Sequence, residues 1–215
     1  MTGADAEDSF AVRRRHARHL TEIGIGAGLL GLGTLLLADS RKQVPRWEQD
    51  LFAGINDLPD ELKPVLFVEM QLGSFWAIPL VSLGMVAWRK PRAGLTAAVA
   101  GLAAWLLAKV VKHQVERGRP FELLSGVHVR ESGITGLGFV SGHTAVSFAL
   151  ATALTPWING KWRVVPFALA SCVGFARIYV GAHLPLDVLG GAGVGIACGS
   201  LSAWAFGRPH PRGEQ

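Results

Sequence analysis

The sequence predicts an all-α membrane protein, a bundle of six transmembrane helices with an interfacial amphipathic helix between helices 1 and 2. Two observations predict this fold class. Of the 215 residues, 50% are hydrophobic and 17% are charged, whereas a soluble domain usually carries about a quarter charged residues. Several apolar segments also approach the roughly 20 residues that a helix needs to cross a bilayer.

Residues 1–20 are polar and then basic. We expect a cytoplasmic tail here rather than a cleaved signal, because the apolar segment that follows lacks a small-residue cleavage site. The membrane domain is expected to cover residues 21–207, and residues 208–215 form a second short cytoplasmic tail.

The first span is expected over Thr21–Ala38, where four glycines favour close helix contact: Gly24, Gly28, Gly31 and Gly33. Residues 39–61 are polar but carry apolar side chains at near-helical spacing, which is typical of a helix lying at the membrane interface. These side chains are Trp47, Leu51, Phe52, Ile55 and Leu58. The later spans are expected at Leu62–Trp88, Ala93–Val111, His143–Trp157, Val164–Tyr179 and Leu184–Phe206. The fourth span, at His143, is short and needs tilt or an inset start.

Short basic segments set the expected orientation. They occur at residues 13–18, 89–92, 161–163 and 208–212, at alternate ends of the spans. The positive-inside rule makes that side cytoplasmic, so both termini lie inside. Residues 39–61 carry acidic side chains that offset their bases, as expected outside: Glu48, Asp50, Asp57, Asp60 and Glu61. Residues 112–142 are expected to lie outside although they are basic. This exception to the positive-inside rule indicates that the segment has a functional role.

The net charge of +5 does not indicate nucleic-acid binding. No aromatic and basic RNA-binding module is visible, and much of the excess charge lies between apolar segments. Anionic membrane lipids are therefore the expected partners. The sequence leaves the oligomeric state open, a homo-oligomer included.

Three polar clusters lie at helix ends that share the outer face. In the first, Lys112 ends a span and Arg119-Pro120 follows, so that a point charge and a planar guanidinium can hold one oxyanion. Ordinary snorkelling and positive flanking charge form the alternative interpretation, and it is the one we adopt for the neighbouring Lys109, His113 and Arg117.

The second cluster is Ser141-Gly142-His143, directly before an apolar segment. Serine is a favoured N-cap, glycine allows close approach to a ligand, and a helix N-terminus attracts anions. His143 can exchange a proton near neutral pH at the same place. An ordinary helix cap followed by an interfacial histidine is the alternative interpretation.

The third cluster contains Arg177, His183 and Asp187. Pro185 is tolerated in a first helical turn, so His183 is expected at or just before a helix start, with Asp187 about one turn in. Four-residue spacing lets the carboxylate reach the imidazole, fix its tautomer and leave the other nitrogen free to attack. A capping aspartate and a surface histidine form the alternative.

Together, Lys112-x6-Arg119-Pro120, Ser141-Gly142-His143 and Arg177-x5-His183-x3-Asp187 resemble the three-part signature of the type 2 phosphatidic acid phosphatase (PAP2) superfamily. The matched region covers about a third of the chain. Val140 stands where the family commonly has proline, and Ala176 where it commonly has serine. These departures concern the tuning of the loop and the substrate rather than the reaction type.

The resemblance implies a membrane lipid phosphatase. His183 would form a phosphohistidine, Asp187 would orient it, and His143 would serve as general acid and then base. Phosphate would be held by Lys112, Arg119 and Arg177 and by the backbone N–H groups of Ser141 and Gly142. Glu69 is a further candidate, as an indirect partner of the basic cluster, because intramembrane ionisable residues are often functional.

The implied substrate is a lipid phosphate or diphosphate of the outer leaflet. Undecaprenyl diphosphate is favoured, then phosphatidic acid or phosphatidylglycerol phosphate, and the loop of residues 121–138 is expected to help select among them. No cofactor and no metal is expected, because three fixed cations can stabilise the charge that phosphoryl transfer develops. Two alternatives stay open: a lipid phosphotransferase using the same intermediate, and a non-catalytic protein that binds lipid phosphates.

Overall fold

A computed structural model describes residues 21–23, 25–27, 29–30 and 43–206, and it places no β-strand in that part of the chain. Both predicted cytoplasmic tails, residues 1–20 and 208–215, and most of the first span lie outside the described residues. The helices are α2 (Arg46–Asn56), α3 (Lys63–Glu69), α4 (Ala77–Ala87), α5 (Pro91–Val115), α6 (Pro120–Leu123), α7 (Gly142–Leu154), α8 (Val164–Tyr179) and α9 (Pro185–Phe206). Short 3₁₀ turns connect several of them: η1 (Asp60–Leu62), η2 (Met70–Gly73), η3 (Thr155–Trp157) and η4 (Gly160–Arg163).

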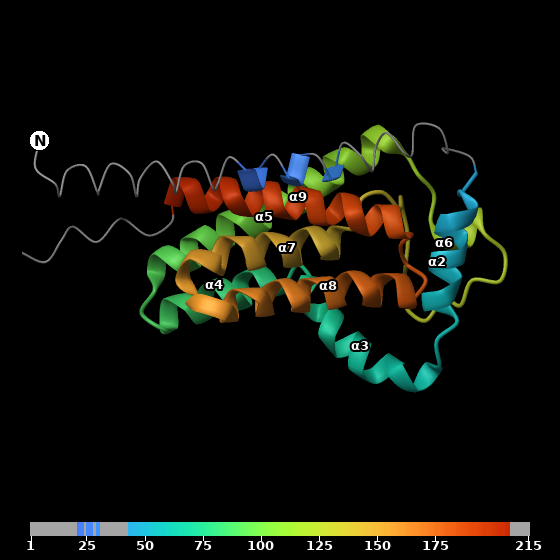
Figure 1. Ribbon diagram of the computed structural model, residues 1–215, viewed down its shortest axis with the longest axis horizontal. Coiled ribbons are helices and arrows are strands. Elements are labelled where there is room, and N and C mark those ends of the chain that lie inside the picture. The colour runs from blue at the N-terminus through green and yellow to red at the C-terminus, as the bar shows by residue number, and fades with distance from the viewer. Residues whose placement is uncertain (1–20, 24, 28, 31–42, 207–215) are drawn as a thin grey trace, which may run out of the picture.

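Four long helices form the bundle, in which α7 packs on α5, α8 and α9 (Figure 1). Their directions alternate, so the C-terminal ends of α5 and α8 meet the N-terminal ends of α7 and α9 at one end of the bundle. Helices α2 and α6 lie across this end, on the right in Figure 1. The three polar clusters of the sequence therefore come to the same end.

Helix α9 approaches α7 closely because glycines line the contact. A Cβ atom at Gly195 would lie 2.5 Å from the carbonyl oxygen of Ala145, and one at Gly191 would lie 2.5 Å from that of Ser141. On its other side, Gly193 of α9 faces Gly26 of the first predicted span. The close contact expected for the first span is therefore made at Gly26, whereas Gly24, Gly28, Gly31 and Gly33 lie outside the described residues.

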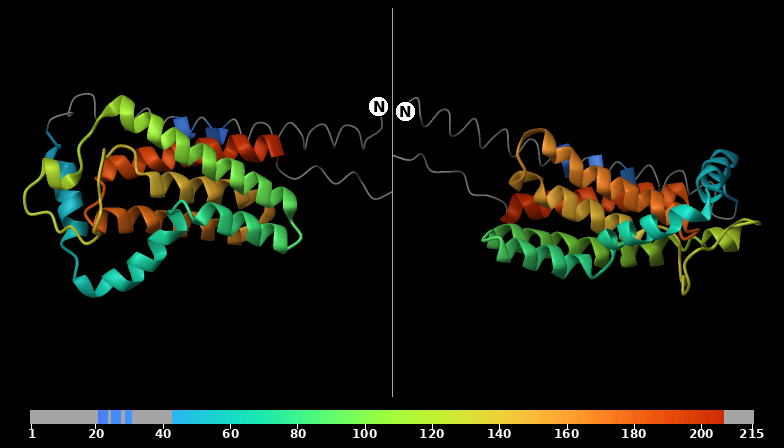
Figure 2. Two further views of the ribbon diagram at one scale, coloured as in Figure 1. Left: turned by 180° about the vertical axis from the view of Figure 1, so that it is seen from behind. Right: turned by 90° about the horizontal axis from the view of Figure 1, so that it is seen from below.

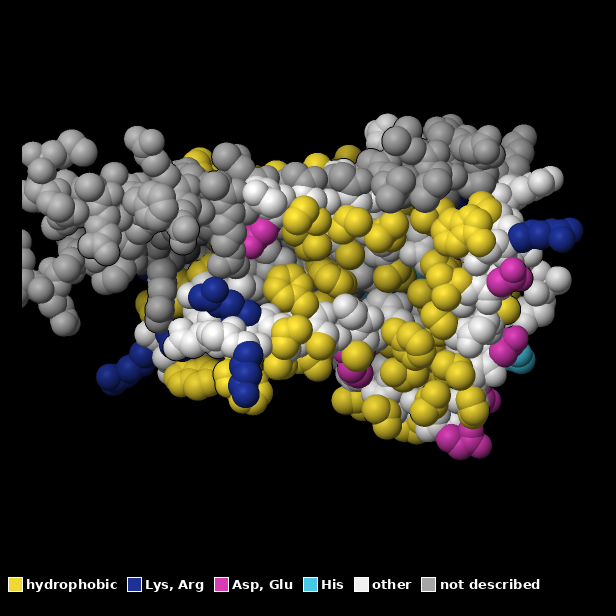
Figure 3. All heavy atoms as spheres, viewed as in Figure 1, with side chains coloured by type: hydrophobic (Ala, Val, Ile, Leu, Met, Phe, Trp, Pro, Cys, Tyr) yellow, Lys and Arg dark blue, Asp and Glu magenta, His cyan; other side chains and the backbone are white. Residues whose placement is uncertain are grey.

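Within the described residues, two helical segments are long and apolar enough to cross a membrane, Pro91–Leu123 and Pro185–Phe206. A bent pair, Asp60–Gly73 with Ala77–Ala87, would make a third span if its two parts act as one. Hydrophobic side chains cover the face of the bundle in Figure 3, and many large ones are exposed, such as Leu80 and Leu106. These features mark an integral membrane protein, although the expected count of six spans is not confirmed, since α7 and α8 have only 13 and 16 residues.

The predicted span Leu62–Trp88 is not one straight helix, because the helix axis turns by 70° between its two parts. Gly73 lies against the carbonyl oxygen of His143, where no side chain would fit. The next residue, Ser74, is extended, with ψ at 162°, which ends the helical hydrogen bonding. As a result α3 leaves the bundle, as the left view in Figure 2 shows.

Helix α2 has the amphipathic character predicted for residues 39–61, but its buried face differs from the expected one. Trp47 and Leu51 are exposed, while Glu48, Phe52 and Asn56, four residues apart, face the protein. Glu48, one of the acidic residues predicted to lie outside, is completely buried in the protein. It is buried because a cationic partner lies beneath α2.

Candidate active site

A pocket of about 270 Å³ opens at the end of the bundle where the polar clusters meet. Six of the residues predicted from the sequence line it: Lys112, Arg119, Gly142, His143, Arg177 and His183. Residues 131–135 of the long loop before α7 complete its wall. The expectation that cations and imidazoles distant in the sequence converge in space therefore agrees with this geometry.

Two of the cations are held rigidly by backbone carbonyls. Lys112, in the last turn of α5, donates to the carbonyl oxygens of Leu137 and Gly138 at 2.8 and 3.0 Å. Arg119, just before α6, donates to the carbonyls of Thr135, Gly136 and Ala182. The loop before α7 is thus fastened to both cations, which pre-organises positive charge at the pocket.

The imidazole of His183 lies between Arg119 and Asp187. Its Nε2 is 3.0 Å from Nη1 of Arg119, and its Nδ1 is 3.6 Å from Oδ2 of Asp187. The same Nη1 lies 3.5 Å from Nδ1, so the guanidinium stands beside the ring and close to both of its nitrogens. The separation of 3.6 Å exceeds a hydrogen bond, and catalytic hydrogen bonds are often long before substrate binds.

His183 is buried in the segment between α8 and α9, just before the helix start as predicted. Burial, followed by the positive charges of Lys112, Arg119 and Arg177, lowers the pKa of the His183 imidazole well below its usual range. The ring is therefore neutral at neutral pH. The neutral form of an imidazole is the one that can attack an electrophile.

The Ser141 side chain is the N-cap of α7, as predicted, because its Oγ accepts from the Thr144 backbone N–H. Its own N–H donates to the carbonyl oxygen of Asp187 at 2.8 Å. The expectation that the Ser141 N–H binds phosphate is therefore wrong, since that donor is already used. Gly142 and His143 begin α7 and face the pocket, where a helix N-terminus favours an anion.

Arg177, at the end of α8, forms an ion pair with Glu131, with 2.7 Å between Nη1 and Oε2. The same nitrogen lies 3.4 Å from the sulfur of Met70. Sequence reasoning missed Glu131, which lies in a loop without regular spacing. The Glu131 carboxylate is therefore paired with Arg177, one of the three cationic side chains that are expected to bind the phosphoryl group.

Arg117 was interpreted as an ordinary flanking charge, and that interpretation is wrong. Its side chain is 2% exposed and pairs with both Glu48 and Asp187.

Glu69 was a candidate partner of the basic cluster, but it does not line the pocket, and neither carboxylate oxygen has a hydrogen-bond partner among the described residues.

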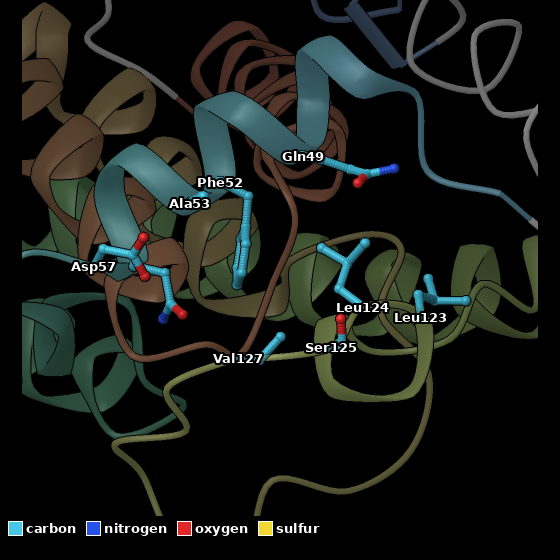
Figure 4. Close-up of a pocket in the computed structure, with 10 residues that line it drawn as sticks. Gln49, Phe52, Ala53, Asp57, Leu123, Leu124, Ser125 and Val127 are labelled. Carbon is cyan, nitrogen blue, oxygen red and sulfur yellow. The ribbon is translucent and has the colours of Figure 1, made fainter.

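A second cavity, of about 360 Å³, lies between α2 and residues 123–127 (Figure 4). Gln49, Asn56 and Asp57 supply much of its polarity, together with Ser125. The described residues that line it include no lysine, arginine or histidine. This cavity therefore lacks the charge to hold a phosphate, and the smaller pocket is the candidate active site.

The family model of the PAP2 superfamily matches residues 93–210, more than half of the chain. The chain belongs to the PAP2 superfamily. The matched region contains every cationic and imidazole side chain of the pocket, and it leaves out α2 and Glu48.

Individual PAP2 relatives agree with this assignment. An undecaprenyl-diphosphatase of Sulfolobus acidocaldarius is 30% identical over 120 residues, which cover 53% of this chain and 55% of that protein. The crystal structure of Aquifex aeolicus LpxE superposes with a TM-score of 0.67 at 29% identity, covering 73% of this chain and 94% of that one. The crystal structure of a transmembrane PAP2-type phosphatidylglycerolphosphate phosphatase from Bacillus subtilis superposes with a TM-score of 0.62 at 26% identity, covering 82% of this chain and 93% of that one.

Proposed function

We propose that this protein is a lipid phosphatase that hydrolyses a lipid phosphate or diphosphate through a phosphohistidine on His183. The observation that carries the proposal is the setting of the His183 ring. Arg119 Nη1 lies 3.0 Å from its Nε2 at the pocket, and Asp187 Oδ2 lies 3.6 Å from its Nδ1. Nucleophile, orienting carboxylate and cations are then arranged as phosphoryl transfer requires.

In the first step, Nε2 of His183 attacks phosphorus and the bond to the leaving oxygen breaks. His143 gives a proton to that oxygen, and Asp187 stabilises the charge that develops on the ring. Lys112, Arg119 and Arg177 hold the phosphoryl oxygens, together with the N–H of Gly142. In the second step, His143 takes a proton from water, and the water oxygen displaces His183 to release phosphate.

Undecaprenyl diphosphate is our leading substrate, because a relative bears the name undecaprenyl-diphosphatase. Phosphatidylglycerol phosphate is next, supported by the likeness to the Bacillus subtilis phosphatase, and phosphatidic acid is the third candidate. The loop 121–138 takes part in the selection, since its residues 131–135 line the pocket.

We further propose that the pocket faces the non-cytoplasmic side. The basic turns at Arg89–Arg92 and Lys161–Arg163 connect the ends of the helices opposite the pocket, on the left in Figure 1. Positive charge marks the cytoplasmic ends of membrane helices. The site then meets lipid headgroups of the outer leaflet.

The test is phosphate release from the three candidate lipids by purified protein in detergent. His183→Ala is expected to reduce turnover by about 1,000-fold or more, because it removes the nucleophile. His128→Ala is the matched control, since His128 is an exposed histidine at the same end of the bundle and outside the pocket. Wild-type rates in His183→Ala would overturn the mechanism. Transfer of phosphate to an added alcohol, without release, would favour the phosphotransferase alternative.

A further inference from the structure

A buried charge cluster connects α2 to the back of the candidate active site. Glu48 of α2, Arg117 before α6 and Asp187 of α9 are each at most 2% exposed. Arg117 Nη2 lies 2.6 Å from Glu48 Oε2, and Nη1 lies 2.9 Å from Asp187 Oδ1. One guanidinium thus bridges two carboxylates from elements far apart in the chain.

Both oxygens of the Asp187 carboxylate have partners, one in the cluster and one in the backbone. Oδ1 accepts from Arg117, while Oδ2 accepts from the Leu184 backbone N–H at 2.8 Å and faces His183 Nδ1. The carboxylate plane is therefore fixed from the side opposite His183. A partner that fixes an orienting group in this way governs the geometry of the group that reacts.

Glu48 holds Arg117 in place and also reaches the start of α9. Its Oε1 accepts from Arg117 Nη1 at 3.1 Å and from the Leu186 backbone N–H at 2.9 Å. Leu186 is the residue before Asp187. Helix α2, which the PAP2 family match leaves out, is therefore bound to the polypeptide that carries the carboxylate.

Stability alone explains this cluster poorly. Two buried carboxylates and one guanidinium are costly to desolvate, and apolar residues of similar volume often serve stability equally well. Arg117 Nε is buried with no hydrogen-bond partner among the described residues. A buried charge cluster of this kind is better explained by a role in holding the residues of the candidate active site in place.

We propose that Arg117 and Glu48 are positioning residues for the His183–Asp187 pair, through which α2 sets the orientation and the charge state of Asp187. This proposal rests on the proposed function of that pair. Arg117 favours the ionised form of Asp187, and Glu48 moderates that effect by sharing the guanidinium charge.

The charged groups around Asp187 come from several elements of the fold. Glu48 and Arg117 lie on one side, His183 on the other, and Lys112 and Arg119 are within electrostatic range. The acidic limb of the kcat/KM profile belongs to the coupled His183–Asp187 pair. Changing the charge of Arg117 or of Glu48 should therefore move this limb, in opposite directions.

The experiment compares Arg117→Gln, Glu48→Gln and Arg130→Gln in full-length protein. Arg130 is the matched control, because its side chain is only 8% exposed and also binds α2, through the Asn56 carbonyl, and the end of α8, through the Tyr179 carbonyl. It makes no contact with Asp187 in the described structure. Each variant is measured for thermal unfolding, kcat, KM and the pH dependence of kcat/KM, with wild type and His183→Ala alongside.

We expect Arg117→Gln to lower kcat by about 10- to 100-fold with KM nearly unchanged, and to move the acidic limb to higher pH. Glu48→Gln should move the limb to lower pH, and it keeps the proposal testable if Arg117→Gln does not fold. Arg130→Gln should lower the unfolding temperature with the wild-type pH profile.

An unchanged acidic limb in Glu48→Gln, or a shift of the same sign in both variants, would overturn the positioning role and leave the proposed function standing. Wild-type turnover in His183→Ala would instead remove the proposed function itself. The two failures are therefore distinguishable within one set of measurements.

Discussion

The ion pair between Glu131 and Arg177 makes a quantitative prediction about anion binding. An anionic phosphoryl group that binds Arg177 must compete with the Glu131 carboxylate, whose Oε2 lies 2.7 Å from the guanidinium. Replacing Glu131 by glutamine removes that competing charge and keeps the side chain's size. We therefore expect Glu131→Gln to bind inorganic phosphate and orthovanadate more tightly than the wild type.

The magnitude follows from the geometry. Two unit charges about 4 Å apart interact by about 4 kcal/mol at an effective dielectric constant of about 20. The Glu131 side chain is 20% exposed, so solvent screening and the remaining amide contact reduce the net effect to about 1–2 kcal/mol. Since about 1.4 kcal/mol corresponds to a factor of ten, the inhibition constant should fall by about 5- to 30-fold.

The assay is competitive inhibition of lipid-phosphate hydrolysis by orthovanadate, at fixed ionic strength. Asp57→Asn is the matched control, because it removes one negative charge from the same end of the protein, at an exposed position outside the pocket. A similar gain in Asp57→Asn would mean that overall charge, not the ion pair, limits anion binding. Weaker inhibition of Glu131→Gln would refute the competition directly.

Three further predictions concern the site and the bundle. Because burial and three cations lower the pKa of His183, the ring stays neutral when the pH falls through about 6.5, the ordinary histidine value; kcat/KM should still be near its plateau at pH 6, and a steep loss between pH 7 and 6 would contradict the neutral-nucleophile assignment. The positive charge that stabilises the transferred phosphoryl group comes from Lys112, Arg119 and Arg177, so activity should be unchanged after dialysis against EDTA. A loss of activity that Mg²⁺ or Zn²⁺ restores would contradict this role of the three side chains. Gly195→Val should lower the free energy of unfolding by about 2 kcal/mol or more, since its Cβ would lie 2.5 Å from the Ala145 carbonyl, whereas Gly84→Val, with open space at its Cβ position, should change it far less in the same denaturant titration.

Much of the helix pattern could be predicted from the sequence. Val164–Tyr179 was expected as one segment and is helix α8, and Pro185–Phe206 lies within the expected last span. Apolar runs bounded by charges and prolines carry that information locally. The bend after Gly73 could not be predicted, because the apolar composition continues across it and the close contact of Gly73 is with His143, which is distant in the sequence.

The residues of the candidate site also fall into two groups, those that the sequence could predict and those that it could not. Lys112, Arg119, His143, Arg177 and His183 stand at helix ends with recognisable spacing, and they line one pocket. No recognisable spacing marks Glu48, Arg117 and Glu131. Arg117 is 69 residues from Glu48 and 70 from Asp187, and Glu131 is 46 residues from Arg177. A single buried charge is recognised as functional only when its partner is known. One signal was nevertheless present, since Glu48 shares a four-residue spacing with Phe52, the buried apolar residue of α2.

The central claim is that His183 carries the phosphoryl group during turnover, and trapping that group tests it most directly. Purified protein would be mixed with a lipid phosphate labelled with ³²P, quenched rapidly in alkaline detergent to preserve phosphohistidine, and mapped by mass spectrometry. We expect label on His183, which disappears in His183→Ala and persists in His128→Ala. Label on a different side chain, or steady phosphate release with no labelled protein at any quench time, would contradict it.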